Sequence, residues 1–247
     1  MRKLPFEILK YVEKKDYTID RVGESPSKVY IYETMVLKVS TRNIDAEREY
    51  QALISLQGHI PVPRVICYIE TRKKSYLLME RISGKPLFQW PMEMAIEVAC
   101  QGLKWLWRIE IAHPVFSHQA HALETIKNNI PFYQDHWDDD TLKQRFKTPK
   151  SLYDYLEANY PDQAPIVLSH GDYYLPNILF DGKKITGMID FGYMGYFPKE
   201  RDVSALIKSL VYNYGFQSDY LEKIETTLGM HFKPEWLEYF TLYDELI

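Results

Sequence analysis

The chain has 247 residues, 46% of them hydrophobic, which is enough to bury one large core or two smaller lobes. Its formal net charge is −4 without a long basic run, which excludes the usual nucleic-acid-binding composition and is compatible with a cationic substrate. No apolar run reaches the ~20 residues of a membrane span, and charges interrupt the N-terminus too early for a signal peptide. We therefore expect a cytoplasmic monomer that binds neither nucleic acid nor membrane.

The first third of the sequence predicts a small antiparallel sheet preceded by a short helix over residues 4–14. About five strands are expected, and the β-rich runs lie at 28–32, 35–39, 62–70 and 75–82. The turn at residues 23–27 precedes the first of these runs. Its backbone amides near Ser25 and Ser27 are candidates to cradle phosphate oxygens, although the turn has no glycine-rich pattern.

One lysine and one helix stand out beside this sheet. Lys38 lies between apolar neighbours on a predicted strand, where a lysine is usually just the outward residue of a half-buried strand. The following helix, over 44–57, is expected to begin with Asn43 as its cap. It carries Glu47 and Glu49, which face different directions because they are two residues apart.

The rest of the chain is predicted to be mostly helical. We expect a boundary near residues 83–86, giving an N-terminal lobe of 1–83 and a C-terminal lobe of 84–247. The predicted helices lie at about 91–111, 123–129, 149–159, 199–214, 218–228 and 234–247. The expected core positions of the first are Met94, Val98, Leu103, Leu106 and Trp107. The acidic, aromatic segment 133–140 is expected to be a loop.

The most informative stretch is 168–192, LSHGDYYLPNILFDGKKITGMIDFG. It places Asp172 five residues before Asn177, and then Asp190 at the end of a short apolar run. Between them, two apolar runs flank Asp181 and Gly182, a pair typical of a tight type I′ hairpin turn. The hairpin is expected to bring Asp190 back towards the other two side chains. Two carboxylates and an amide oxygen are suitable ligands for Mg²⁺ bound to phosphate.

This order and spacing resemble the kinase signature, and the HGDxxxxN and IDFG motifs look like the aminoglycoside phosphotransferase and choline kinase superfamily. The chain is most similar to the aminoglycoside 3′-phosphotransferases over almost its whole length. The other segments that carry the resemblance are SPSKVY at 25–30, ERE at 47–49, PVP at 61–63, WDDDT at 137–141, LYDYL at 152–156 and the terminal YDELI. The resemblance implies an α+β, two-lobed, protein-kinase-like fold.

The resemblance also implies an activity, which is transfer of the γ-phosphate of ATP, or of GTP, to a hydroxyl of an aminoglycoside antibiotic. In this interpretation Asp172 orients the attacking hydroxyl and accepts its proton. Asn177 and Asp190 hold Mg²⁺, and Lys38 binds the phosphates with Glu49 as its partner. A magnesium-dependent resistance enzyme is therefore the leading hypothesis.

The resemblance says less about which residues contact the nucleotide base. Met79 would face the base, although a role in the core is equally compatible with the sequence, and the backbone from Glu80 to Ile82 would pair with it. The 3′-phosphotransferases stack an aromatic ring on adenine at the position of Val36 here. Because that ring is missing, use of GTP stays an open alternative. Leu175 and Tyr193 also replace charged residues of that family.

The acceptor is expected to meet a cluster of acids. The candidate acceptor-binding residues are Asp135, Asp138, Lys208, Asp244, Glu245 and Ile247. Apolar residues at the very end suggest that the C-terminus docks instead of fraying. A kinase of choline, a macrolide or a metabolite is the alternative acceptor class. A catalytically dead nucleotide-binding regulator is a third hypothesis. The presence of all five polar groups expected of an active enzyme argues against it, and these are Lys38, Glu49, Asp172, Asn177 and Asp190.

Overall fold

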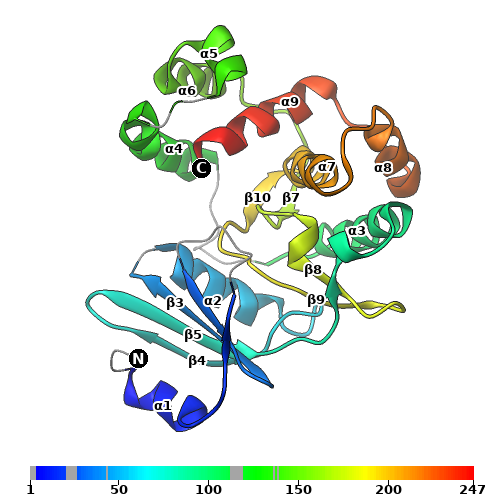
Figure 1. The fold of residues 1–247 in the computed structure, drawn as a ribbon. Helices are drawn as coiled ribbons and strands as arrows, with labels where there is room; N and C mark the ends of the chain where they lie inside the picture. The colour runs from blue at the N-terminus through cyan, green and yellow to red at the C-terminus, as the bar shows by residue number, and fades with distance from the viewer. Residues whose placement is uncertain (1–3, 21–26, 43, 112–118, 136, 138) are drawn as a thin grey trace. The chain divides into compact units, whose positions relative to one another are not determined.

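The computed structural model describes residues 4–20, 27–42, 44–111, 119–135, 137 and 139–247. The chain divides into two compact units, one of residues 1–90 and 176–194 and one of residues 91–175 and 195–247 (Figure 1). We call them the sheet unit and the helical unit. This division differs from a boundary after residue 83, because residues 84–90 and 176–194 pack within the sheet unit. The α+β class predicted from the sequence is confirmed.

The sheet unit is built on a five-stranded antiparallel sheet in the order β1-β2-β3-β5-β4. Its strands are β1 (Thr18–Ile19), β2 (Lys28–Ile31), β3 (Met35–Thr41), β4 (Val65–Glu70) and β5 (Lys74–Glu80). Four of them match the predicted runs, and the short β1 has no comparable signal in the sequence. The long central pair β3 and β5 is in register over seven residues.

Side chains alternate between the two faces of β3, and this alternation determines the face on which Lys38 lies. Leu37 and Val39 are buried in a cluster with Ile8 and Val12 of α1 (Phe6–Val12), so this side of β3 faces that helix. Because successive side chains point to opposite faces of a sheet, Lys38 lies on the other face. There α2 (Ile44–Leu56) contacts β4 and β5. The expected cap of α2, Asn43, lies outside the described residues.

A second, three-stranded sheet of the order β6-β8-β9 completes the sheet unit. It consists of β6 (Lys85–Pro86), β8 (Ile178–Phe180) and β9 (Ile185–Met188). The 3₁₀ turn η1 (Leu87–Gln89) follows β6, and the 3₁₀ turn η2 (Leu175–Asn177) leads into β8. The predicted tight turn is wrong, because Phe180 pairs with Ile185 and four residues connect the strands. The Asp181 carboxylate accepts hydrogen bonds from the N–H groups of Lys183 and Lys184, so this side chain closes a longer turn.

The helical unit contains seven α-helices within its described residues. They are α3 (Met92–Leu106), α4 (Gln119–Asp135), α5 (Asp140–Phe146), α6 (Pro149–Ala158), α7 (Glu200–Tyr214), α8 (Tyr220–Leu228) and α9 (Pro234–Tyr243). A short ladder of β7 (Ile166–Ser169) and β10 (Gly195–Pro198) lies among them, and η3 (Asp244–Leu246) follows α9. None of the helices in the described ranges is long and apolar enough to cross a bilayer.

Three expectations for this unit need correction and one is confirmed. The first helix ends at Leu106, not near residue 111. Met94 is 38% exposed and is not core, because the apolar stripe of α3 is wider than its buried face. Segment 133–140 is not simply a loop, since its first residues end α4 and its last begins α5. The side chain of Thr148 caps α6, as the sequence predicts.

A glycine in the hairpin gives a test of this packing. A methyl group at Gly187 would overlap the side chain of Ile82. We expect Gly187→Ala to lower the free energy of unfolding by ~1–3 kcal/mol, the usual cost of overpacking. Adding Ile82→Ala should recover part of this loss by making room. Urea denaturation of the single and double variants measures both effects, and strictly additive losses would contradict the contact.

Candidate active site

The sheet unit brings together the cation and two of the carboxylates singled out in the sequence. The Lys38 ammonium donates hydrogen bonds to Glu49 Oε1 at 2.7 Å and to Asp190 Oδ1 at 2.8 Å. The three groups come from β3, from α2 and from the residues after β9. The predicted pairing of Lys38 with Glu49 is therefore present in the structure, and Asp190 is a second partner.

Burial and charge oppose each other in this trio. Burial alone disfavours the charged form of Lys38, but Glu49 and Asp190 outweigh it and raise the pKa of the lysine. Burial raises the pKa of Glu49, and the Lys38 ammonium opposes that rise. The side chains of Lys38 and Glu49 are 12% and 10% exposed, whereas that of Asp190 is 39% exposed. The lysine is thus a fixed positive charge beside one accessible carboxylate.

The backbone segments that carry Asn177 and Asp190 meet at the base of the hairpin. The N–H of Ile189 donates to the carbonyl of Asn177 at 3.0 Å, so the two ends of the hairpin meet there. Asp190 has φ +68, a left-handed conformation that an aspartate tolerates better than most residues. An amide oxygen and an accessible carboxylate fit Mg²⁺, which in phosphate sites takes few protein ligands. The described residues contain no cluster of three or more His, Cys, Asp or Glu that could hold a metal.

Asp172 lies in the helical unit, in the loop 170–174 that precedes η2. The N–H of Asp172 contacts His170 Nδ1 at 3.3 Å, and its carbonyl accepts from the N–H of Tyr174 at 2.9 Å. The hydroxyl of Tyr173 donates to the Ala99 carbonyl of α3. These contacts fix the backbone on both sides of the candidate base.

A buried acid that the sequence analysis missed anchors the start of this loop. Asp202 of α7 is fully buried and accepts from Trp107 Nε1, from Ser169 Oγ and from the N–H of Gly171. Burial raises the pKa of Asp202, and these three donors oppose the rise. Leu206 lies one helical turn later on the same face, which is the signal that could have shown Asp202 to be buried.

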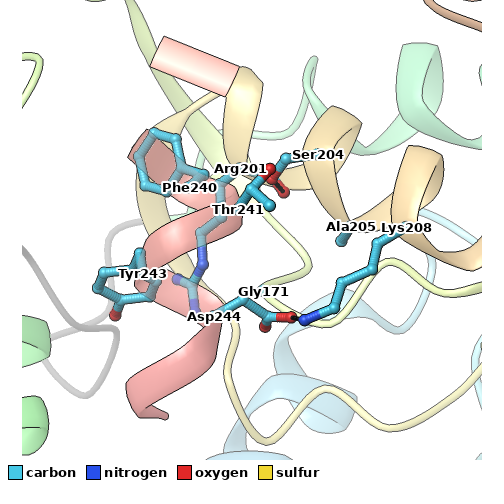
Figure 2. A pocket seen from close by; sticks show the side chains of 9 residues that line it. All are labelled: Gly171, Arg201, Ser204, Ala205, Lys208, Phe240, Thr241, Tyr243 and Asp244. Atoms are coloured by element: carbon cyan, nitrogen blue, oxygen red, sulfur yellow. Dashed lines mark hydrogen bonds and ion pairs between the residues drawn. The ribbon is translucent and has the colours of Figure 1, made fainter. Parts of the chain in front are cut away.

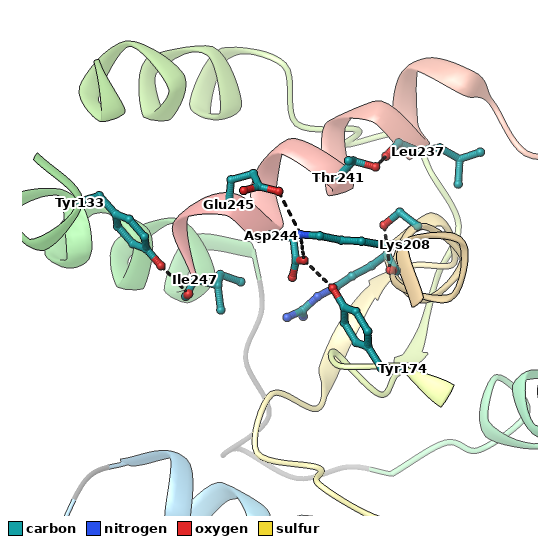
Figure 3. Close-up of polar contacts among 10 residues, drawn as sticks. Tyr133, Tyr174, Lys208, Leu237, Thr241, Asp244, Glu245 and Ile247 are labelled. Carbon is teal, nitrogen blue, oxygen red and sulfur yellow. Dashed lines mark hydrogen bonds and ion pairs between the residues drawn. The ribbon is translucent and has the colours of Figure 1, made fainter. Parts of the chain in front are cut away.

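The C-terminal acids have a cation of their own (Figure 3). Lys208 Nζ donates to Asp244 Oδ2 at 2.6 Å and to Glu245 Oε1 at 2.9 Å. Burial disfavours charge on Lys208, but the two carboxylates outweigh it and raise the pKa of the lysine. The hydroxyl of Tyr174 donates to the same Asp244 oxygen at 2.7 Å. We call Lys208, Asp244 and Glu245 the terminal charge cluster.

The chain end is docked, as expected from its apolar residues. Leu246 is fully buried in the core cluster of the helical unit, which is worth roughly 1.5–3 kcal/mol for a leucine. The Tyr133 hydroxyl donates to the Ile247 carbonyl oxygen at 2.7 Å (Figure 3). The Asn129 side-chain amide donates to the Leu246 carbonyl at 3.5 Å. The backbone of the last two residues is therefore docked on α4, whereas the terminal charge cluster is held by Lys208 of α7.

A small pocket lies beside this cluster (Figure 2). Gly171, Ser204, Lys208, Thr241 and Asp244 are among its lining residues. Arg201 also lines it. Its guanidinium lies over the Phe197 ring, 3.9 Å from the centroid, and one of its terminal nitrogens is buried with no hydrogen-bond partner among the described residues. The buried cation of Arg201 thus lines the same pocket as Gly171 of the 170–174 loop and Asp244 near the chain end.

The remaining predicted residues have mixed outcomes. Ser25 and Asp138 lie outside the described residues, and Asp135 ends α4 without a described side chain. The hydroxyls of Ser27 and Ser40 are 2.7 Å apart. Val36 pairs with the buried Met79 across β3 and β5, which suits either the core or the floor of a base site. The roles proposed for these residues stay predictions.

Comparison with known proteins places this geometry in a family. Residues 16–239 match the phosphotransferase enzyme family. The chain belongs to this family. It is 30% identical, over 262 aligned positions, to an aminoglycoside 3′-phosphotransferase of Enterococcus faecalis, with 97% of each chain covered. A Staphylococcus aureus enzyme of the same name is also 30% identical, over 261 positions and 97% of both chains. The resemblance seen in the motifs is confirmed.

Solved structures of this family confirm the fold. The structure of an aminoglycoside 3′-phosphotransferase of type VIII matches with a TM-score of 0.79, at 21% identity and 94% coverage of both chains. An aminoglycoside phosphotransferase from Streptomyces rimosus, solved with ADP and streptomycin, matches with a TM-score of 0.77. Its identity is 18%, over 97% of this chain and 95% of the other.

The Lys38 trio makes a prediction about stability. Lys38→Met leaves a buried Glu49 without its cation, so we expect the free energy of unfolding to fall by ~3–5 kcal/mol. Adding Glu49→Gln should recover part of the loss, because a neutral amide costs less to bury than a carboxylate. The control is Lys150→Met, which removes an exposed pair with Asp154 and should cost under ~1 kcal/mol. Equal losses in the two lysine variants, by urea denaturation, would refute the role of the trio.

Proposed function

We propose that the protein transfers the γ-phosphate of a nucleoside triphosphate to a hydroxyl of an aminoglycoside. The observation that carries the proposal is the buried Lys38 ammonium held between Glu49 and Asp190. Such a fixed cation beside an accessible carboxylate suits a bound metal–triphosphate. The acceptor class is supported by the relatives, which are named aminoglycoside 3′-phosphotransferases. They do not favour choline, a macrolide or another metabolite as acceptor.

Each group has a distinct task in this reaction. Lys38 binds phosphate oxygens, and Glu49 keeps its ammonium from turning away. Asn177 and Asp190 would hold Mg²⁺, which supplies charge neutralisation on the phosphates when bound. The acceptor hydroxyl oxygen forms a bond to the γ-phosphorus while the bond from phosphorus to the leaving oxygen of the nucleoside diphosphate breaks. The proton of the hydroxyl passes to the Asp172 carboxylate.

The nucleotide base would be recognised by the backbone of residues 80–82, at the end of β5 and directly after it. The N–H groups of Glu80 and Arg81 already donate to the carbonyls of Arg64 and Thr34. A nucleotide base is therefore left with the N–H of Ile82 and with carbonyl oxygens. With Val36 in place of a stacking ring, we propose that ATP is the donor and that GTP is accepted as well.

The terminal charge cluster is the proposed contact for acceptor amino groups. Its cation is already paired with both acids, but its side chains are each 33–39% exposed. Exposed ion pairs exchange partners at little cost. An ammonium group of the acceptor can therefore join Asp244 and Glu245 or take the place of Lys208.

The test of catalysis is Asp172→Asn. We expect kcat for phosphate transfer to an aminoglycoside to fall ~10²-fold or more, the usual range of a general base. Affinity for the nucleotide should stay nearly unchanged, because Asp172 acts on the acceptor. The matched control is Asp162→Asn, an exposed acid of the same unit. Near-normal turnover in the Asp172 variant would refute its role.

The test of acceptor binding is the double variant Asp244→Asn with Glu245→Gln. We expect KM for a polycationic acceptor to rise ~10-fold or more, equivalent to ~1.4 kcal/mol. KM for the nucleotide should not change. The control, Glu222→Gln with Glu235→Gln, makes the same change in net charge at exposed positions. If both double variants raise KM equally, the effect is one of overall charge and the terminal acids are not the contact.

A further inference from the structure

Tyr174 connects the catalytic loop to the chain end through two different hydrogen bonds. Its backbone N–H donates to the Asp172 carbonyl at 2.9 Å. Its hydroxyl donates to Asp244 Oδ2 at 2.7 Å (Figure 3). One residue therefore holds the backbone of the candidate base with one end and a carboxylate of the terminal charge cluster with the other.

The other anchors of this loop end on buried groups. Gly171 bonds Asp202, the Tyr173 hydroxyl bonds the Ala99 carbonyl, and the N–H of Leu175 donates to Ser209 Oγ. Asp202, Tyr173 and Ser209 are fully buried, so these contacts do not change with what binds at the surface. The contact of Tyr174 differs, because its acceptor is a carboxylate that is 33% exposed.

The same carboxylate oxygen of Asp244 is shared with a cation. Lys208 Nζ lies 2.6 Å from Oδ2, the atom that also accepts from Tyr174. A hydrogen bond to an ionised carboxylate is stronger than one to a neutral acceptor, so its strength depends on the charge of that oxygen. Burial, with the negative charge of Asp244, raises the pKa of Tyr174, so its hydroxyl stays a donor. Replacing the cation that contacts Asp244 therefore changes the strength of the hydrogen bond from the Tyr174 hydroxyl.

We propose that Tyr174 is a positioning residue that couples occupation of the terminal charge cluster by the acceptor to the placement of Asp172. The proposal rests on the proposed function, in which this cluster binds acceptor amino groups. Tyr174 itself takes no proton and contacts no reacting atom. It acts through the backbone bond to Asp172.

The experiment compares two tyrosines that both donate to the chain end. Tyr174→Phe removes the bond to Asp244, and Tyr133→Phe removes the bond to Ile247 without a link to the loop. We expect kcat for an aminoglycoside to fall ~10-fold in Tyr174→Phe, a typical cost of losing precise positioning, and less than ~2-fold in Tyr133→Phe. In an Asp244→Ala background, Tyr174→Phe should have little further effect on kcat.

Hydrogen exchange separates this proposal from the proposed function. Amides of residues 172–175 should exchange faster in Tyr174→Phe than in the unaltered protein, and Tyr133→Phe should leave them unchanged. If the unaltered protein phosphorylates no aminoglycoside, the proposed function fails, and exchange still decides the role of Tyr174. Equal effects of the two variants on kcat or exchange, or additive effects with Asp244→Ala, would overturn the proposal.

Discussion

The ammonium of Lys38 is the charge on which the sheet unit depends. It sits on a central strand and binds Glu49 from α2 and Asp190 from the end of the hairpin. A buried carboxylate without a cation is costly, so the lysine makes it possible for these segments to meet. Because the side chain of Asp190 is 39% exposed, the same arrangement leaves its carboxylate accessible to a ligand. Stability and the proposed phosphate chemistry therefore use one set of contacts.

The helical unit contains a second lysine that is paired with two acids, and this lysine is more exposed to solvent. Lys208 also lies between two acids, but its side chain is 39% exposed, compared with 12% for Lys38. A buried ion pair holds a fixed geometry, whereas an exposed pair exchanges partners readily. The first suits a frame for phosphates, and the second suits recognition of a cationic acceptor. Figure 3 shows that the loop carrying the candidate base reaches the second cluster through Tyr174.

The sequence predicted what depends on local spacing. The return of the segment carrying Asp190 towards Asn177 follows from a hairpin, whereas the pairing of Lys38 with Glu49 was predicted from the resemblance to kinases, since spacing alone did not choose between Glu47 and Glu49. Contacts made by tertiary packing could not be predicted. Asp202 lies in the first turn of a helix, where an acid is usually solvated, yet it is buried under Trp107 and Ser169. The Asp181 turn was misjudged because its side chain bonds the backbone two and three residues later.

The central claim is that this chain moves the γ-phosphate to an aminoglycoside hydroxyl. The most direct measurement is a mass spectrum of the aminoglycoside after incubation with the protein, Mg²⁺ and ATP carrying ¹⁸O in its γ-phosphate. We expect an aminoglycoside bearing one phosphate with the labelled oxygens, and an equal amount of ADP. An unaltered aminoglycoside, with the label released only as free phosphate or retained in ATP, would contradict it.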